Sequence, residues 1–282
     1  MSDFTIAFQQ PYTKMPMMRT EQRLLPVIPP LAISLASCII VLAFLEWFPR
    51  FGYDSQLPSL SGVLGRVYEQ LRSGQLTQAL LISGQRWGIG FGAATIFSLL
   101  LGLLMARSRF LAGVVQPVLG FIYPMPNAIL ILIFAGWLGV GLLTMSGIVM
   151  LAAMVPASML MYHAFIEVDE KQIWAARSLG CHGSRLAWSV TIPAVAPRLL
   201  TALRIALPTS LFATIGTELL IRNGGIGAFL FNAYAIGDYQ TVWGAALVAT
   251  FIGVGLDSLF YLFGRLLFPW DAHLKEWSTL DE

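Results

Sequence analysis

The sequence predicts an all-α integral membrane protein with six transmembrane helices, and two features carry that prediction. Hydrophobic residues make up 57% of the 282 residues and charged residues only 11%, whereas about a quarter of a soluble domain is charged. Six apolar stretches are also long enough to cross a bilayer, which takes about 20 helical residues. They are residues 28–49, 87–106, 112–137, 142–164, 196–221 and 241–265.

The first apolar stretch and the positive charges orient the chain. Stretch 28–49 exceeds the roughly 7–15 residues of a signal-peptide core, so we expect an uncleaved first span behind a polar tail, 1–27. With that tail inside, eleven of the 17 Lys and Arg residues are cytoplasmic and five are outside, which predicts that both termini, including the tail 266–282, are cytoplasmic. The expected outer set is Arg50, Arg66, Arg72, Arg86 and Arg222.

The outer loop expected at 50–86 contains an amphipathic stretch, "LSGVLGRVYEQLRSG". Helical spacing gathers its apolar residues near one face, which predicts a helix lying at the membrane interface and ended by Gly74. A packed connector is the alternative interpretation. The residues of this face are Leu60, Val63, Leu64, Val67 and Leu71.

Composition and motifs argue against several other functions. The net charge of +2 gives no electrostatic case for a nucleic-acid partner. Two cysteines, Cys38 and Cys181, and three scattered histidines have no metal-site spacing, and a disulfide is not expected. The dipeptide Gly-Lys of a phosphate-binding loop never occurs. We therefore expect no catalytic residue, no metal and no cofactor bound by this chain.

The third apolar stretch contains "YPMPNAILI", in which Pro124 and Pro126 must interrupt the helical hydrogen bonds. A membrane tolerates such a break only where protein or a water-filled cavity covers the freed backbone groups. These two prolines, with Tyr123 and Asn127, are therefore candidates for lining a pathway. A kink that only shapes packing is the alternative.

Between the fourth and fifth stretches lies a polar segment, 169–193, which predicts two short cytoplasmic helices. Asp169 can cap the first, with Gln172 as capping-box partner, and Gly180 can end it with a positive φ. Ser184 can cap the second, which Pro193 closes. Such a pair suits docking into a groove of a partner, although an ordinary loop helix is the alternative. The docking candidates are Ile173, Trp174, Ala175, Ala176, Leu179, Gly180, Ser184, Arg185 and Pro193.

Besides the charges near their cytoplasmic ends, three charged residues lie deeper inside the predicted fifth and sixth spans. Arg204 and Asp257 each fall roughly 10–12 Å from the cytoplasmic face at about 1.5 Å per residue, so we expect them to form an ion pair. The alternative is that Arg204 snorkels to headgroups while Asp257 faces water. For Glu218 we expect Arg222, four residues on, as partner.

The segment 169–193 resembles the cytoplasmic motif of ABC importer permeases, which reads E-A-A, three residues, G, nine residues, I-x-L-P. Here Ala175 and Ala176 precede Gly180 by the required spacing, and nine residues later the chain reads "VTIP", ending at Pro193. Trp174 stands where the family has an acidic residue, so a salt bridge made at that position is not expected here.

The resemblance covers roughly residues 60–270 and points to the nitrate, sulfonate, taurine and bicarbonate importers. It includes "YPMPNAILILIFAGWLGVG", "YHAFIEVDEKQIWAARSLG", "GTELLIRNGGIGAFLFNA", Asp257 and the dipeptide Pro269-Trp270. The resemblance implies a type I importer fold with a core over 87–265 in a bacterial inner membrane. It implies these partners: a second permease copy, two ATPase subunits that bind ATP and magnesium, and a periplasmic or lipid-anchored binding protein.

The implied mechanism is alternating access, in which closure of the ATPase dimer moves the cytoplasmic helices and pivots the spans. Pro193 and Pro197 would form a fixed elbow before the fifth span. A small anion such as a sulfonate, nitrate or taurine is the favoured cargo, with a pyrimidine-type vitamin precursor as alternative. A secondary transporter with Arg204, Asp257 and Glu218 as relay is the runner-up class, and a membrane anchor without a pathway is the third.

Overall fold

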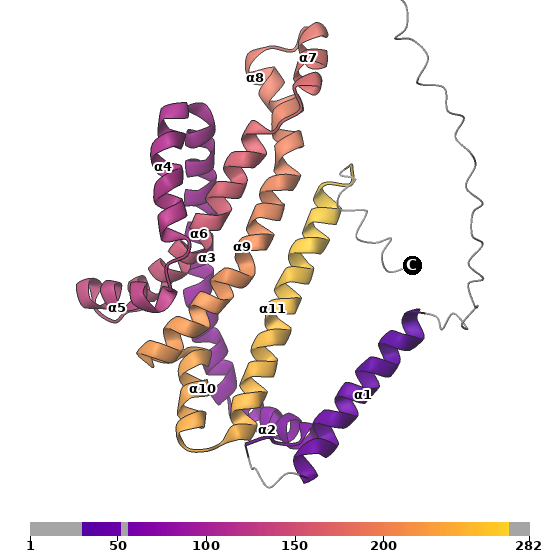
Figure 1. Ribbon diagram of the computed structural model, residues 1–282, viewed down its shortest axis with the longest axis vertical. Coiled ribbons are helices and arrows are strands. Elements are labelled where there is room, and N and C mark those ends of the chain that lie inside the picture. Colours follow the sequence, from indigo (N-terminus) through magenta and orange to yellow (C-terminus); the bar gives the residue numbers. More distant parts are fainter. Residues whose placement is uncertain (1–29, 52–55, 271–282) are drawn as a thin grey trace, which may run out of the picture. The chain divides into compact units, whose positions relative to one another are not determined.

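The computed structural model describes residues 30–51 and 56–270, and all regular structure in that part of the chain is helical (Figure 1). The chain divides into two units, residues 1–45 and 46–282. The helices are, in order, α1 (Pro30–Phe51), α2 (Leu60–Arg72), α3 (Gln75–Arg107), α4 (Arg109–Ile122), α5 (Asn127–Leu138), α6 (Leu142–Ile166), α7 (Glu170–Ser178), α8 (Gly183–Leu186), the π-helical turn η1 (Ala187–Thr191), α9 (Ile192–Ile221), α10 (Gly225–Ala235) and α11 (Tyr239–Leu267).

Four helices of the described residues are long and apolar enough to cross a membrane. They are α3, α6, the continuous helix Gly183–Ile221 that ends in α9, and α11. Helix α1 matches the first predicted stretch, 28–49, in position. The stretch 112–137 is interrupted where its prolines predict a break, and it forms two shorter apolar helices, α4 and α5. The count of six spans therefore stays a prediction.

The core of residues 46–282 is formed by α3, α6 and α9. Small side chains dominate it, and the larger Phe91, Met161 and Leu207 fill the space between them. Without water between helices in a bilayer, association depends on close packing rather than on the hydrophobic effect. The alanines of this core are Ala94, Ala153, Ala157, Ala202 and Ala206.

Helices α3 and α6 approach so closely that two positions of α3 admit only glycine. A Cβ on Gly90 would lie 2.6 Å from the Ser146 carbonyl oxygen, and one on Gly102 would lie 2.9 Å from the Met161 Cβ. Both distances are below van der Waals contact, so any side chain would force the helices apart. These two glycines set the spacing of the core.

Helices α4 and α5 are the two halves of the broken stretch. Met105, Ala112, Leu119 and Val155 form a second core cluster that holds α4 against α3 and α6. In Figure 1, α5 then runs across the end of α4 instead of continuing it. The break follows from the prolines 124 and 126, which cannot donate the helical hydrogen bonds.

The loop predicted at 50–86 is shorter than expected. Residues 60–72 do form a helix, α2, and Gly74 follows it with φ +78°. Helix α3 begins at Gln75, however, and not at residue 87. The stretch 75–86 is therefore part of a core helix, and its polar residues are placed by the packing of α3. Figure 1 shows α2 and α10 at one end of this unit and α7 and α8 at the opposite end.

Candidate functional site

Helix α7 begins and ends with the groups that the sequence suggests. The Asp169 carboxylate accepts a hydrogen bond from the Lys171 amide at 2.9 Å. At the other end, the Gly180 amide bonds to the Arg177 carbonyl and the Cys181 amide to the Ala176 carbonyl. These two bonds form a Schellman motif, and Gly180 has the predicted positive φ, +82°.

The second predicted helix is not a separate element. Ser184 does not cap it, because α8 begins at Gly183 behind His182, which makes no side-chain capping bond. Pro193 does not close it either, since the helix continues through η1 into α9 with Pro193 in its first turn. Proline lacks the N–H that would bond four residues back. In η1 the Ile192 amide bonds five residues back, to Ala187.

The loop at this end exposes large apolar side chains. Trp174 is 69% exposed, Leu179 85% and Trp188 72%. Of the predicted docking residues, only Ala176 is buried, whereas Ile173 and Pro193 are half-buried. The exposed ones are Trp174, Ala175, Leu179, Gly180, Ser184 and Arg185. Exposed apolar side chains of a membrane protein contact lipid or another protein, and Trp137 and Phe110 are equally exposed elsewhere in the chain.

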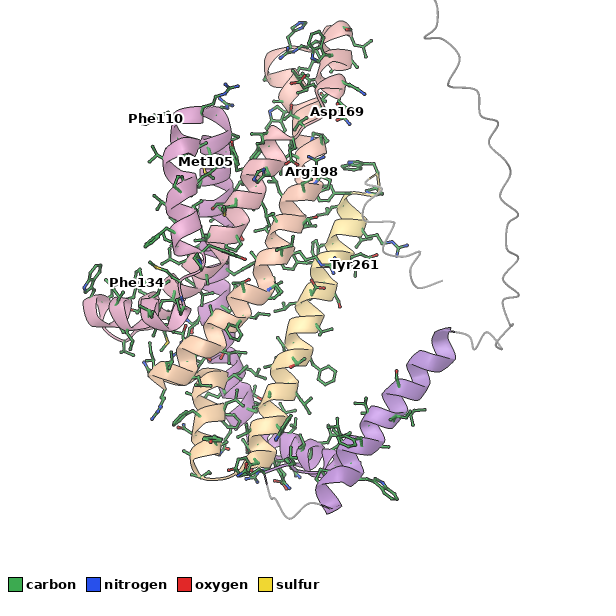
Figure 2. The ribbon with its side chains drawn as sticks, in the orientation of Figure 1. Met105, Phe110, Phe134, Asp169, Arg198 and Tyr261 are labelled. Atoms are coloured by element: carbon green, nitrogen blue, oxygen red, sulfur yellow. The ribbon has the colours of Figure 1, made fainter. Side chains whose placement is uncertain are left out.

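A cleft of about 550 Å³ lies beneath this loop. Arg198 of α9 spans one side, where its guanidinium donates to the Glu167 carbonyl oxygen at 3.0 Å. This bond joins the end of α6 to the start of α9, and Figure 2 shows Asp169 and Arg198 at the same end of the molecule. The lining residues are Val168, Asp169, Gln172, Ser189, Val190, Pro193, Ala194, Pro197, Arg198 and Trp270.

Arg204 of α9 and Asp257 of α11 are brought together. The Arg204 Nε donates to Asp257 Oδ1 and its Nη2 donates to Oδ2, both at 2.7 Å. The guanidinium also lies 5.2 Å from the centre of the Tyr261 ring. The two side chains are 34% and 38% exposed. This bidentate geometry is the strong form of an arginine–carboxylate pair, and it joins α9 to α11.

The prediction for Glu218 was wrong, because its partner is Arg86 and not Arg222. Arg86 Nη1 donates to Glu218 Oε1 at 2.9 Å, with the two side chains 8% and 0% exposed. Ser83 and the Gly227 amide donate to the other carboxylate oxygen at 2.7 and 3.1 Å. Arg86 also donates to the carbonyls of residues 223 and 224.

Arg222 instead adopts a left-handed conformation, φ 59°, that ends α9. Its amide still donates to the Glu218 carbonyl at 2.8 Å, but the Glu218 carboxylate pairs with Arg86. The Arg222 guanidinium lies 3.5 Å from the centre of the Phe231 ring, a cation–π contact. The sequence does not predict this role for Arg86, because the apolar stretch 87–106 begins one residue after it. The small residues Ala79 and Ser83, at helical spacing before Arg86, are the signal that could have extended the helix.

The residues around the break behave differently from one another. Tyr123 is 63% exposed and lines a cavity of about 90 Å³, which Leu151 and Thr209 also border. Pro124 and Pro126 are exposed in the turn. The side chain of Asn127 is outside the part of the chain that the structure describes. The structure therefore places the break beside α6 and α9.

Helix α2 and the start of α11 are joined by a second charged network, which the sequence does not predict. Arg66 of α2 donates to Asp238 at 2.6 Å, and Thr241 donates to the same Asp238 oxygen at 2.6 Å. Burial opposes ionisation of Asp238, but the hydrogen bonds from Thr241 and Arg66 outweigh it and lower its pKa. Gln70 of α2 also donates to Thr241, so α2 is fixed to the start of α11.

Residues 98–270 match the family described as "binding-protein-dependent transport system inner membrane component". The taurine transport system permease protein TauC of Escherichia coli is 26% identical over 71% of this chain and 73% of its own. The putative aliphatic sulfonates transport permease protein SsuC of the same organism is 29% identical over 78% and 84%. The ergothioneine permease and binding protein EgtU of Helicobacter pylori is 29% identical over 60% of this chain and 30% of its own.

The family match covers more than half of the chain and includes α7, α8, η1 and the Arg204–Asp257 pair. Its extent agrees with the apolar helices, which make the chain a multi-pass membrane protein. The chain therefore belongs to the inner-membrane components of binding-protein-dependent transport systems, the permeases of ABC importers.

Proposed function

We propose that this chain forms the transmembrane pathway of an ATP-driven importer for a small sulfonate-type anion in a bacterial inner membrane. Two copies would form the pathway, two separate ATPase subunits would bind ATP and magnesium, and a binding protein would deliver the cargo. Among the sequence-derived cargoes, the names of the taurine and aliphatic sulfonate relatives favour sulfonates.

The observation that carries the coupling role is the exposed loop that continues directly into α9. Trp174 and Leu179 are exposed at its surface, and η1 joins α8 to α9 without a break. A force applied to the loop would reach α9 through continuous helix, and a rigid-body pivot needs such a lever. The continuous helix replaces the proline elbow that the sequence suggested.

The position of the break in the third stretch supports a pathway role for Tyr123. Its turn lies against α6 and α9, and backbone groups freed in a broken helix are those that transporters offer to cargo. The family match over residues 98–270 favours an importer permease over the secondary-transporter alternative. Arg204, Asp257 and Glu218 are all held in close ion pairs that join helices to one another.

The coupling role is tested by Gly180→Val. Gly180 has φ +82° and open space around it, so valine would strain the backbone without creating a clash. We expect at least tenfold slower ATP-dependent taurine uptake into proteoliposomes that contain the assembled transporter, while the amount of inserted protein is unchanged. Gly113→Val is the matched control, because Gly113 also has open space but an ordinary φ.

Two results would contradict the proposal. Unchanged uptake and unchanged co-purification with the ATPase in Gly180→Val would exclude coupling through this loop. Uptake that is absent for taurine and for aliphatic sulfonates in the wild type, but present for another solute, would keep the permease function and reject the cargo class.

A further inference from the structure

Helix α2 has three exposed apolar side chains beside a face that is already packed. Val63 is buried, and Val67 lies so close to Gly244 of α11 that a Cβ there would be 2.6 Å from it. Leu64 is 56% exposed, Tyr68 66% and Leu71 45%. We call these last three residues the α2 outer face.

The outer face is a continuous extension of the packed face. Successive helical residues are about 100° apart, so Leu64, Tyr68 and Leu71 fall within about 60° of one another. Arg72 and Glu69 occupy the next part of the circumference, and both are exposed. Ser61, on the same side, donates its hydroxyl to Glu46 of α1 at 2.8 Å. The order around the helix is thus protein contact, exposed apolar, exposed polar.

The rotation of α2 is fixed from the packed side. Arg66 pairs with Asp238 at 2.6 Å, and Gln70 donates to Thr241 at the start of α11. The helix cannot turn to bury Leu64, Tyr68 and Leu71 without breaking both contacts. Their exposure is therefore a fixed property of the fold.

Three observations indicate what covers the outer face. Gln75 begins α3, which is long and apolar enough to cross a membrane, three residues after Arg72, so α2 lies at one end of a candidate membrane-crossing helix. Tyr68 and Trp243 are exposed aromatic groups with polar ends, the type that gathers at the level of lipid headgroups. Three side chains are also far too small a surface for a stable protein interface, which needs roughly 800 Å² from each partner.

We propose that α2 lies in the bilayer surface, with Leu64, Tyr68 and Leu71 among lipid chains and headgroups and with Glu69 and Arg72 in water. An apolar arc bordered by a polar arc is the geometry of a helix in the membrane interface. The Arg66–Asp238 pair then ties this lipid-bound helix to α11. The proposal depends neither on the cargo nor on the ATPase.

The test is a fluorescence scan of the full chain. Single cysteines replace residues 63, 64, 68, 69, 71 and 72 in a background with Cys38→Ala and Cys181→Ala, and each carries a small environment-sensitive dye. The labelled proteins are reconstituted in vesicles of phosphatidylethanolamine and phosphatidylglycerol. Iodide quenches dyes in water, and dibrominated lipid chains quench dyes in the bilayer.

At positions 64, 68 and 71 we expect at least twofold quenching by brominated lipid and little by iodide. At 69 and 72 we expect the reverse, and the dye at the buried position 63 should respond least to both. Strong iodide quenching at 64, 68 and 71 would overturn the proposal. Protection of these three from both quenchers would also overturn it, because protein would then cover the face.

Discussion

The two ends of the permease differ in which side chains they expose and which they bury. At the end of α7 and α8, the side chains of Trp174, Leu179 and Trp188 are exposed, and the Asp169 carboxylate caps α7. At the end of α10, the Glu218 carboxylate is fully buried and bonded to Arg86, Ser83 and the Gly227 amide. The first end leaves large apolar side chains uncovered by the chain, and the second is held together by the chain itself.

This contrast assigns different consequences to substitutions. At the α10 end, a change removes an interaction that the fold needs, so its effect should appear as lost stability. At the α7 end, a change alters a surface that the isolated chain leaves uncovered, so its effect should appear in coupling. Stability and transport are therefore the two measurements that separate the regions.

The largest effect should follow from Glu218→Gln. The amide keeps the size of the side chain but leaves the Arg86 guanidinium buried without its counter-charge, and breaking a buried pair in this way costs about 3–5 kcal/mol. We expect a large fall in the yield of monodisperse protein and in Tm. Arg222→Gln is the control, because Arg222 is exposed and contacts only the Phe231 ring among the interactions described.

Equal damage from Glu218→Gln and Arg222→Gln would contradict the Arg86 pairing. It would support instead the partner that sequence spacing suggested. The comparison thus separates a local i,i+4 pair from a pair between helices α9 and α3.

A second, smaller effect distinguishes two reasons for glycine. Gly227 in α10 has no unusual φ, but a Cβ there would overlap the Ile215 carbonyl of α9, so Gly227→Asn should destabilise the protein by about 1–3 kcal/mol through overpacking. Gly180 has open space and φ +82°. Asparagine tolerates that conformation, so Gly180→Asn should keep both Tm and transport.

Thermal unfolding in detergent and uptake measured on the same samples would decide this point. If Gly180→Asn lowered Tm as much as Gly227→Asn, space rather than backbone conformation would govern both positions.

The third effect concerns Arg204 and Asp257, which are bidentate but more than a third exposed in the single chain. Protein encloses this pair less than the Arg86–Glu218 pair, so each single neutralisation should lower Tm less than Glu218→Gln does. Reversal of both charges, Arg204→Asp with Asp257→Arg, should recover part of the loss. A double variant no better expressed than the weaker single variant would remove the pair from the account of how α9 and α11 are joined.

The sequence predicts features that depend on neighbouring residues or on depth. The Gly180 conformation follows from the end of a short amphipathic helix, and the depths of Arg204 and Asp257 follow from counting residues along each helix. Arg86 could not be predicted in this way, because its partner belongs to a distant helix and its own position was assigned to a loop. Pro193 was misplaced because proline is compatible with both the end of one helix and the first turn of the next.

The smallest effect should come from pH, acting on the Arg66–Asp238 pair that joins α2 to α11. The pKa of Asp238 is lowered in the folded protein, so the unfolded chain binds a proton more readily than the folded one between its native pKa and the ordinary value of about 3.9. Stability from this group is then fully present above about pH 4 and is lost as pH falls through the lowered native pKa. Because Arg66 and Asp238 are partly exposed, Asp238→Asn should cost no more than about 1 kcal/mol near neutral pH, and the difference from wild type should shrink at acid pH. Tm measured from pH 7 down to pH 3 for both proteins tests this, and a variant deficit that grows with acidity would show that the carboxylate is not the stabilising form.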